Sequence, residues 1–250
     1  MGDFTTRPVM SGSRIREATV AVIGVGGLGC PAALGLAASG IGTIILIDPD
    51  RVELSNLPRQ ILYADADIGR AKVAAAAAAL RSHYRDTAIV EREARLTAEN
   101  AASVLDGADF VVDATDGVAT KLLINDLAVR AGHAFCHAGV VGFRGQLLTV
   151  IPGRTACIRC VFPDVSNEEE AGACSVAGVV GPIAGLIGAL QASHALAYLG
   201  GDQEIAGRLL TYDGLSDRWI EVPTLSLPRC ALCATEGPGA AKAAARAAPP

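Results

Sequence analysis

A glycine-rich turn at residues 24–29, GVGGLG, constrains the fold of this chain more than any other feature. It follows an apolar run at 19–23 and opens a helical pattern at 28–39, and a second apolar run at 43–47 ends at Asp48. Strand, helix and strand within about thirty residues form a βαβ unit, whose strands are parallel and whose crossover is right-handed. The sequence therefore predicts the beginning of a parallel sheet.

The same alternation continues along the chain. Helices are predicted at about 71–83, 98–105 and 118–130, and strands at 88–91, 109–112 and 134–137. A strand at 146–152, a long apolar helix and two short strands at 208–212 and 218–222 follow. We predict an α/β fold with a Rossmann-like, doubly wound, mostly parallel sheet, helices on both faces, and an extension by C-terminal strands.

Composition limits the class of protein. Hydrophobic residues make up 51% of the 250 residues and charged residues 19%, which excludes a disordered chain. The net charge of -5 disfavours extended nucleic-acid binding, and the scattered charges near the N-terminus do not resemble a secretory signal, so we expect a cytoplasmic protein. Residues 175–201 carry no charge and could span a bilayer, but Pro182, Gln191 and His194 favour a buried helix.

We expect residues 1–236 to form a single domain. Its nucleotide-binding core covers about 18–150, and a second part covers about 151–236. The last residues, 237–250, read GPGAAKAAARAAPP and lack large apolar side chains. We predict that this tail is disordered.

The glycine turn predicts a nucleotide site. Glycines let the backbone approach phosphate, the following helix presents free N–H groups, and Asp48 at the end of the next strand can accept hydrogen bonds from a ribose. The alternative is a tight packing turn without a ligand. The candidate residues of this turn and strand end are Gly24, Gly26, Gly27, Gly29, Asp48 and Asp50.

Two basic residues that follow this turn in the sequence indicate which class of nucleotide the site binds. Arg59 and Lys72 would serve nucleotidyl transfer, which develops charge on phosphate oxygens, better than binding of NAD; alone, each could be an ordinary surface charge. Asp113 and Asp116 end a buried strand at the edge where open α/β sheets bind ligands. We assign Asp113 a structural role and Asp116 a magnesium site, the alternative for Asp116 being a helix N-cap.

These motifs together resemble the ThiF/MoeB/HesA group of ubiquitin-activating-like enzymes. GVGGLG, SNLPRQ, IGRAK, DATDG, two CxxC pairs and ACSVAGVVGPIAGLIGALQA occur in family order over about 18–234, and LGCPAAL, VGFRGQL and CIRCVFPD are most similar to ThiF and HesA. The resemblance implies a homodimer that activates the terminal Gly-Gly carboxylate of a ubiquitin-like sulfur carrier with ATP and Mg²⁺. The implied nucleotide contacts are Gly27, Asp48, Ser55, Asn56, Leu57, Pro58, Arg59, Lys72, Asp116 and Gly117, with Arg59, Lys72 and Asp116 catalytic.

The chain departs from the family pattern at two places. Gly117 stands where the family usually has Asn, and the N-terminal RYxRQ-like stretch, whose arginine reaches the partner subunit's site, is not found. Arg7 or Arg14 could substitute. A scaffold that binds a carrier without catalysis therefore remains an alternative, beside a dehydratase acting on modified tRNA and an NAD-dependent oxidoreductase.

The cysteines form a second candidate site. Cys157 and Cys160, like Cys230 and Cys233, make a CxxC pair, and four thiolates satisfy structural zinc; two separate redox pairs are the alternative by spacing alone. The resemblance implies Zn²⁺, a reactive thiol at Cys174, and a separate sulfur donor such as a cysteine desulfurase or rhodanese. Two further cysteines, Cys30 and Cys136, are expected in the core, and the four histidines are assigned no chemistry. The pathway of the carrier is not specified.

Overall fold

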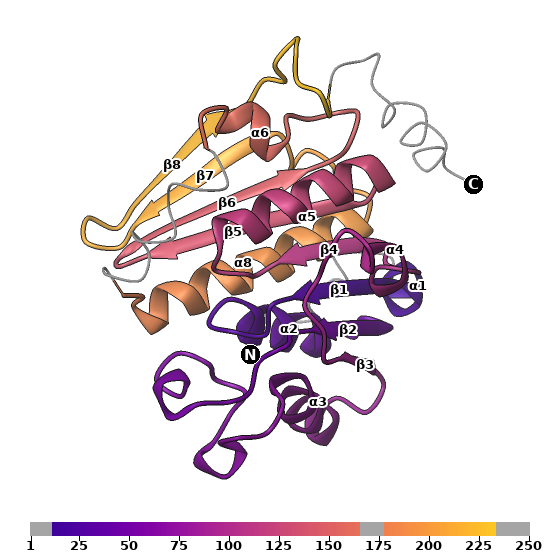
Figure 1. The fold of residues 1–250 in the computed structure, drawn as a ribbon, viewed down its shortest axis with the longest axis vertical. Coiled ribbons are helices and arrows are strands. Elements are labelled where there is room, and N and C mark those ends of the chain that lie inside the picture. Colours follow the sequence, from indigo (N-terminus) through magenta and orange to yellow (C-terminus); the bar gives the residue numbers. More distant parts are fainter. Residues whose placement is uncertain (1–11, 166–177, 234–250) are drawn as a thin grey trace, which may run out of the picture.

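The computed structural model describes residues 12–165 and 178–233, which form an eight-stranded sheet in the order β3-β2-β1-β4-β5-β6-β7-β8 (Figure 1). The neighbours from β3 to β5 are parallel, whereas β6, β7 and β8 are antiparallel along one edge. The strands are β1 (Thr19–Ile23), β2 (Thr43–Ile47), β3 (Ala88–Arg92), β4 (Phe110–Asp113), β5 (Ala134–Val141), β6 (Arg144–Val150), β7 (Arg208–Asp213) and β8 (Arg218–Pro223). The predicted fold class, with its C-terminal extension, is confirmed.

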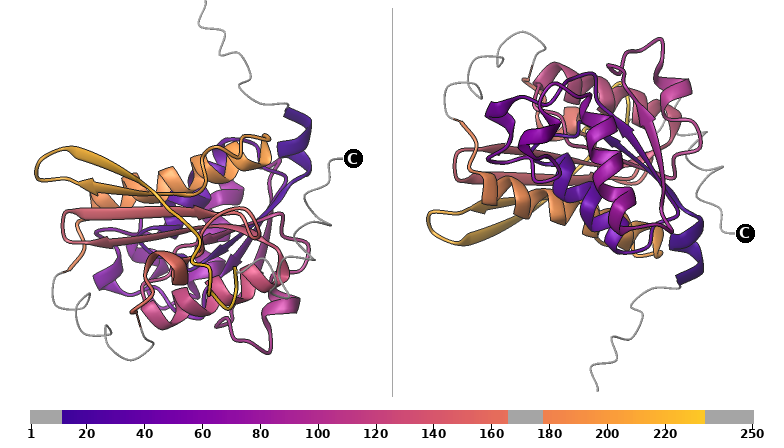
Figure 2. Two further views of the ribbon diagram at one scale, coloured as in Figure 1. Left: turned by 90° about the horizontal axis from the view of Figure 1, so that it is seen from above. Right: turned by 90° about the horizontal axis from the view of Figure 1, so that it is seen from below.

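Helices cover both faces of the sheet (Figure 2). One face carries α2 (Gly29–Ala38), α3 (Lys72–His83) and α8 (Gly181–Leu199); the other carries α4 (Ala101–Val104), α5 (Val118–Ala131) and α6 (Ile158–Val161). Alternate residues of each central strand supply the two cores: in β1, Val20 and Val22 pack on one side and Ala21 and Ile23 on the other. Burial on both faces explains why these strands are continuously apolar.

The long helix α8 is part of the core. It is apolar enough to cross a membrane by length and composition, with a mean hydropathy of 1.2, but it packs against α2 and the sheet. Glycine makes the contact close: a Cβ on Gly188 would lie 2.3 Å from the Leu28 carbonyl oxygen, and a Cβ on Gly35 would lie 3.1 Å from the Ala192 Cβ. The prediction of a buried helix holds for the face that meets α2 and the sheet, whereas other positions such as Leu186, 38% exposed, are not buried.

Some element boundaries were predicted wrongly. The helix expected at 98–105 is only the single turn α4, because the Asn100 side chain accepts the Thr97 N–H at 2.8 Å and holds the preceding residues in a turn. The strand expected at 134–137 continues to Val141, because β5 extends beyond the end of its parallel neighbour β4 and pairs there with β6. Helix α1 (Gly12–Glu17), which precedes β1, was not predicted.

The sheet brings three strand ends together at one edge. Ile23 at the end of β1 is in register with Ile47 of β2 and with Asp113 of β4. The next residues continue the ladder, since Gly24 N–H donates to the Ile47 carbonyl at 2.8 Å and Ala114 N–H donates to the Ile23 carbonyl at 2.9 Å. From β1 the chain passes to β2 and β3 on one side and then returns from β3 to β4 on the other side of β1, so this edge is the topological switch point where such sheets bind ligands.

Candidate nucleotide site and metal centre

The glycine turn is built in a way that only glycine permits. Gly24 has φ of +86°, and a Cβ there would lie 2.8 Å from the Ala114 carbonyl oxygen. A Cβ on Gly29 would lie 1.9 Å from the Gly24 carbonyl oxygen. The turn leads directly into α2, whose N-terminal dipole attracts anions, although the Cys30 N–H already donates to the Gly26 carbonyl at 2.9 Å and Pro31 has no N–H. The backbone thus forms a compact phosphate-type loop.

Asp48 fixes this loop from the neighbouring strand. Its carboxylate is buried, accepting the Val25 N–H at 2.7 Å and the Asp50 N–H at 2.8 Å. Burial raises the pKa of Asp48, while the Lys72 charge and the two N–H donors oppose that rise. A carboxylate has about four acceptor positions, so capacity remains for ribose hydroxyls.

Lys72 meets the same strand end. It is the first residue of α3, is only 7% exposed, and its Nζ donates to the Asp50 carboxylate at 3.0 Å. Asp50 is exposed. The structure therefore brings three of the predicted residues together, with a buried cation at the edge of the site.

The predicted segment 55–59 folds over the glycine turn. Arg59 Nη1 donates to the Ser55 carbonyl at 2.8 Å, and the Arg59 Cδ lies 3.6 Å from the position of a Cβ on Gly27. Asn56 is buried and accepts the Glu53 N–H at 3.1 Å. Arg59 therefore lies beside the loop, whereas Asn56 shapes the backbone that carries it.

Two polar residues of this site were not predicted. The Tyr63 hydroxyl donates to the Val25 carbonyl at 2.7 Å and so holds the backbone of the glycine turn. Gln60 is 4% exposed, its Nε2 lies 3.7 Å from a Cβ position on Gly26, and its Oε1 has no partner among the described residues. An orphaned buried oxygen beside the loop fits a site for a polar ligand. Gln60 is the last residue of the SNLPRQ motif, and its place in that motif could have identified it as a site residue.

Asp113 and Asp116 are placed differently. Asp116 is exposed, and none of the described residues forms a hydrogen bond or ion pair with it. Gly117, not Asp116, occupies the N-cap of α5, so the N-cap alternative for Asp116 is wrong. A Cβ on Gly117 would meet only Thr120 Oγ1, at 3.6 Å, so the departure from Asn is not forced by space. Asp113 is fully buried.

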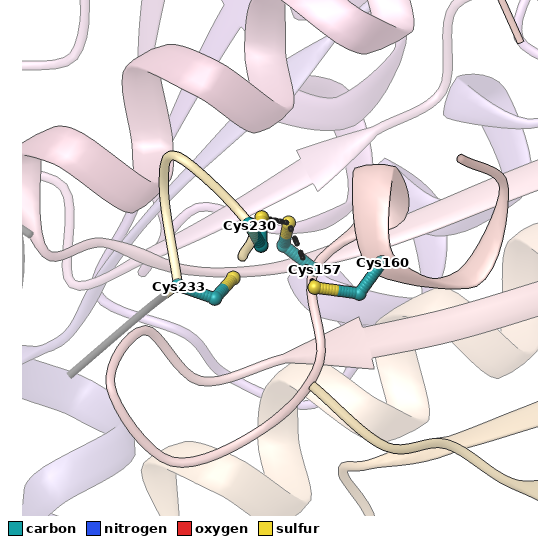
Figure 3. Close-up of side chains that lie close together, drawn as sticks. All are labelled: Cys157, Cys160, Cys230 and Cys233. Atoms are coloured by element: carbon teal, nitrogen blue, oxygen red, sulfur yellow. Dashed lines mark hydrogen bonds between the residues drawn. The ribbon is translucent and has the colours of Figure 1, made fainter. Parts of the chain in front are cut away.

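The four predicted metal ligands converge, although the two pairs are far apart in sequence (Figure 3). The Sγ atoms of Cys157, Cys160, Cys230 and Cys233 all lie within 4.8 Å of one another, with Cys157 3.9 Å from Cys160 and 3.8 Å from Cys230. Tetrahedral zinc with bonds of about 2.3 Å has sulfur–sulfur edges of about 3.8 Å. One closed four-sulfur site fits this geometry better than two separate redox pairs.

The surroundings hold the first pair in place. Asn125 of α5 accepts the Ile158 N–H at 2.9 Å, and Asp126 holds Arg159 by bonds of 2.7 and 2.8 Å. The Leu227 N–H donates to the Cys160 sulfur at 3.4 Å. Helix α5 and the C-terminal segment thus hold the Cys157–Cys160 pair in place.

The thiols differ in acidity. Hydrogen bonding to Cys233 lowers the pKa of Cys157 to about 5 against the effect of burial. Burial raises the pKa of Cys160, and the bond to Cys157 raises that of Cys233. Hydrogen bonding within the cluster therefore favours the thiolate form of Cys157, which is the form that binds metal. By contrast, burial raises the pKa of Cys30 and of Cys136 to about 12, as expected for core cysteines.

Two predicted candidates lie outside the described residues: Cys174 and Arg7. Arg14 lies on α1, which precedes the start of β1, whereas the glycine turn follows the end of β1. Arg14 is therefore at the opposite end of the strand from the site in its own chain.

Comparison with known proteins gives consistent matches. A model of the ThiF family matches residues 8–234. The sulfur carrier protein ThiS adenylyltransferase of Escherichia coli (strain K12) is 40% identical over 221 residues, covering 88% of this chain and 87% of that protein. The SAMP-activating enzyme E1 of Haloferax volcanii is 37% identical over 225 residues, covering 90% and 83%.

Solved structures share the fold. The crystal structure of E. coli MccB with ATP has a TM-score of 0.77 and 23% identity, covering 89% of this chain and 68% of that one. MccB with N-formylated MccA has a TM-score of 0.78 at 24% identity. At this identity the match concerns the fold alone.

Proposed function

The chain belongs to the ThiF family, and from that premise we propose that it uses ATP to adenylylate the C-terminal Gly-Gly carboxylate of a ubiquitin-like sulfur carrier protein. The observation that carries the proposal is the meeting of Arg59 and Lys72 with the glycine turn and Asp48 at one sheet edge. A site for nucleotidyl transfer needs such cations beside the phosphates.

Each residue has a defined task in this proposal. The turn from Gly24 to Gly29 and the start of α2 bind phosphate oxygens, and Asp48 accepts hydrogen bonds from the ribose. Arg59 and Lys72 stabilise the charge that develops on the α-phosphate. Lys72 is held toward the site by Asp50, and its burial strengthens its field. The other proposed nucleotide contacts are Ser55, Asn56, Leu57, Pro58 and Gly117.

The reaction is a substitution at phosphorus. A carboxylate oxygen of the carrier attacks the α-phosphorus of ATP, the bond to the β-phosphate oxygen breaks, and pyrophosphate leaves with the electron pair. The product is an acyl-adenylate. Asp116 is free to hold Mg²⁺, which neutralises phosphate charge when bound. Because Asp116 is exposed and unpaired among the described residues, it can reach such a ligand without breaking an existing contact.

Further parts of the proposal concern the metal and the partners. Zn²⁺ in the four-cysteine site serves structure, because four protein sulfurs leave no open coordination position. The protein acts in the cytoplasm as a homodimer, and a separate desulfurase or rhodanese supplies sulfur to the activated carrier. Cys174 takes part in that later transfer.

ATP–pyrophosphate exchange tests the proposal. The purified chain is incubated with Mg²⁺, ATP, labelled pyrophosphate and a ThiS-type carrier ending in Gly-Gly. We expect exchange that requires the carrier, is lost with a carrier lacking the last glycine, and is lost in Lys72→Met. A folded, zinc-loaded wild-type chain that binds the carrier but exchanges no pyrophosphate would be a scaffold and not an enzyme.

A further inference from the structure

A buried carboxylate directly behind the nucleotide site has no task in the proposed reaction. Asp113, the last residue of β4, is 0% exposed. Its carboxylate accepts His137 Nδ1 at 2.9 Å, Thr115 Oγ1 at 2.7 Å and the Thr115 N–H at 3.2 Å. Lys121 Nζ lies 3.4 Å from Oδ2. Such a charge costs free energy unless every acceptor position is served, and here each oxygen has donors.

Lys121 connects three elements through this carboxylate. It lies in the first turns of α5, is 8% exposed, and its Nζ also donates to the Ala138 carbonyl of β5 at 2.5 Å. Burial alone would raise the pKa of Asp113, but Lys121 and the bonds from His137 and Thr115 outweigh it and lower the pKa to about 2. Burial and the Lys121 charge lower the pKa of His137, which therefore donates as a neutral ring.

The same residues fix the loop that carries Asp116. Residues 113–117, the DATDG loop, turn back so that Thr115 bonds to Asp113, and Lys121 N–H donates to the Gly117 carbonyl at 3.0 Å. On its other side the loop touches the phosphate turn, since a Cβ on Gly24 would lie 2.8 Å from the Ala114 carbonyl oxygen. A shift of the DATDG loop would therefore move both Asp116 and the backbone that faces phosphate.

A second tie reaches the loop from the opposite face of the sheet. Gln191 of α8 is fully buried, and its Nε2 donates to the Asp113 carbonyl at 2.7 Å and to the Cys136 carbonyl at 3.0 Å. Asp113 is thus held through its main chain by α8 and through its side chain by α5 and β5. The loop begins from a residue that cannot move independently of three elements.

We propose that Lys121 and His137, acting through Asp113, are positioning residues that hold the DATDG loop so that Asp116 presents its carboxylate to the metal–phosphate group of the nucleotide. The inference rests on the proposed function for the identity of that group. Neither residue touches the nucleotide in this scheme, and both act through Asp116.

A double-mutant cycle tests this dependence. Lys121→Met should lower the exchange rate about 10–100-fold, the usual cost of losing a partner that orients a metal-binding group. Lys121→Arg, which keeps a charged donor, should restore most of the rate. In an Asp116→Ala background, Lys121→Met should change the rate by less than about threefold, because residues acting through one group are not additive. Full additivity would overturn the proposal.

Nucleotide binding gives a readout that does not depend on turnover. The dissociation constant of ATP is measured with Mg²⁺ and with EDTA, and the constant in EDTA divided by the constant in Mg²⁺ reports the metal-linked part of binding. Lys121→Met should lower this ratio toward that of Asp116→Ala, and His137→Leu should do so more than His137→Gln, which keeps a donor. Equal weakening with and without Mg²⁺ would mean a merely structural role, whether or not the chain exchanges pyrophosphate.

Folding must be separated from positioning. Removing Lys121 alone leaves a buried charge uncompensated, so the pair Asp113→Asn with Lys121→Met, which removes both charges, is measured as well. Arg81→Met serves as a control, because Arg81 pairs with Glu91 at 2.6 Å at the far end of α3. We expect the charge-free pair to fold yet keep the low ratio, and Arg81→Met to match wild type. A charge-free pair with the wild-type ratio would contradict the inference.

Discussion

The parallel part of the sheet and its antiparallel extension are stabilised in different ways. Every residue of β4, and four of five in β1 and β2, are buried, and apart from Asp113 these buried residues are apolar, so burial stabilises these strands by about 25 cal/mol per Å² of apolar surface. By contrast, β7 is half-buried and β8 is exposed along its whole length. The extension instead ends in the four-cysteine site, which ties residues 230–233 back to α6 beside α5. The parallel part can thus leave charged loops at its edge for chemistry, while the extension is held by the pairing of β6, β7 and β8 and, we propose, by a metal at its end.

The largest expected effect is on the extension. Cys230→Ser should abolish stoichiometric zinc and destabilise the chain by several kcal/mol, because metal binding in such sites is coupled to folding. Zinc content and denaturant unfolding measure this. Cys136→Ser is the control, since Cys136 is also buried but lies on β5 away from the cluster. If both variants keep zinc, the four-sulfur site is not a metal site.

The next effect should fall on activity alone. Asp116→Ala should lower exchange about 100–1,000-fold, the range for removing one group that stabilises developing charge. Its stability should change by less than about 0.5 kcal/mol, as for other exposed substitutions. Steady-state exchange and thermal unfolding are compared with Glu99→Ala, another exposed acid. A large loss of stability in Asp116→Ala would remove the contrast between the two regions.

Gly24→Ala tests the phosphate turn against a matched glycine. Gly24 and Gly69 both have φ of +86°, but a Cβ on Gly69 meets nothing within 4 Å, whereas one on Gly24 meets the Ala114 carbonyl. Gly69→Ala should cost about 1 kcal/mol from backbone strain, and Gly24→Ala about 1–3 kcal/mol more, with weaker ATP binding. Denaturant unfolding measures both. Equal costs would mean that the turn is not constrained by the DATDG loop.

The smallest effect is the pH dependence of stability. Burial lowers the pKa of His137 in one region and of His194 in the other, so each is more basic when unfolded. As the pH drops below the unfolded pKa of about 6.5, the unfolded state binds more protons than the folded state. The free energy of unfolding should therefore decrease as the pH is lowered, by up to about 1.4 kcal/mol per pH unit for each group. His137→Gln and His194→Gln should each reduce the slope between pH 7 and pH 5. An unchanged slope in both would refute this assignment.

How much could be predicted from the sequence also differs between the regions. The βαβ unit, the glycine turn and Asp48 were located correctly, because strand ends and loop residues follow from local pattern and parallel topology. The contact between Lys72 and Asp50 was not predicted, and the closure of the two CxxC pairs into one site was predicted only with the family resemblance, since local sequence does not report contacts over 22 and 73 positions.

Other features could not be predicted by local reasoning. His137 was assigned no chemistry, yet it donates to Asp113 across a parallel pair of strands. Lys121 looks like a surface charge on a helix and is buried only because β5 passes beneath it. The β5 strand end was missed because Gly139 and Gly142 interrupt the apolar pattern there, although the pairing with β6 continues.

Intact mass spectrometry of the carrier tests the central claim most directly. The zinc-loaded chain is incubated with MgATP and a Gly-Gly-ended carrier, with pyrophosphatase added, and the carrier is weighed without further chemistry. We predict a carrier heavier by one adenylyl group, lost with C-terminally amidated carrier and with Asp116→Ala. A carrier that binds the chain but keeps its original mass, while ATP stays intact, would contradict adenylylation and leave a carrier-binding scaffold.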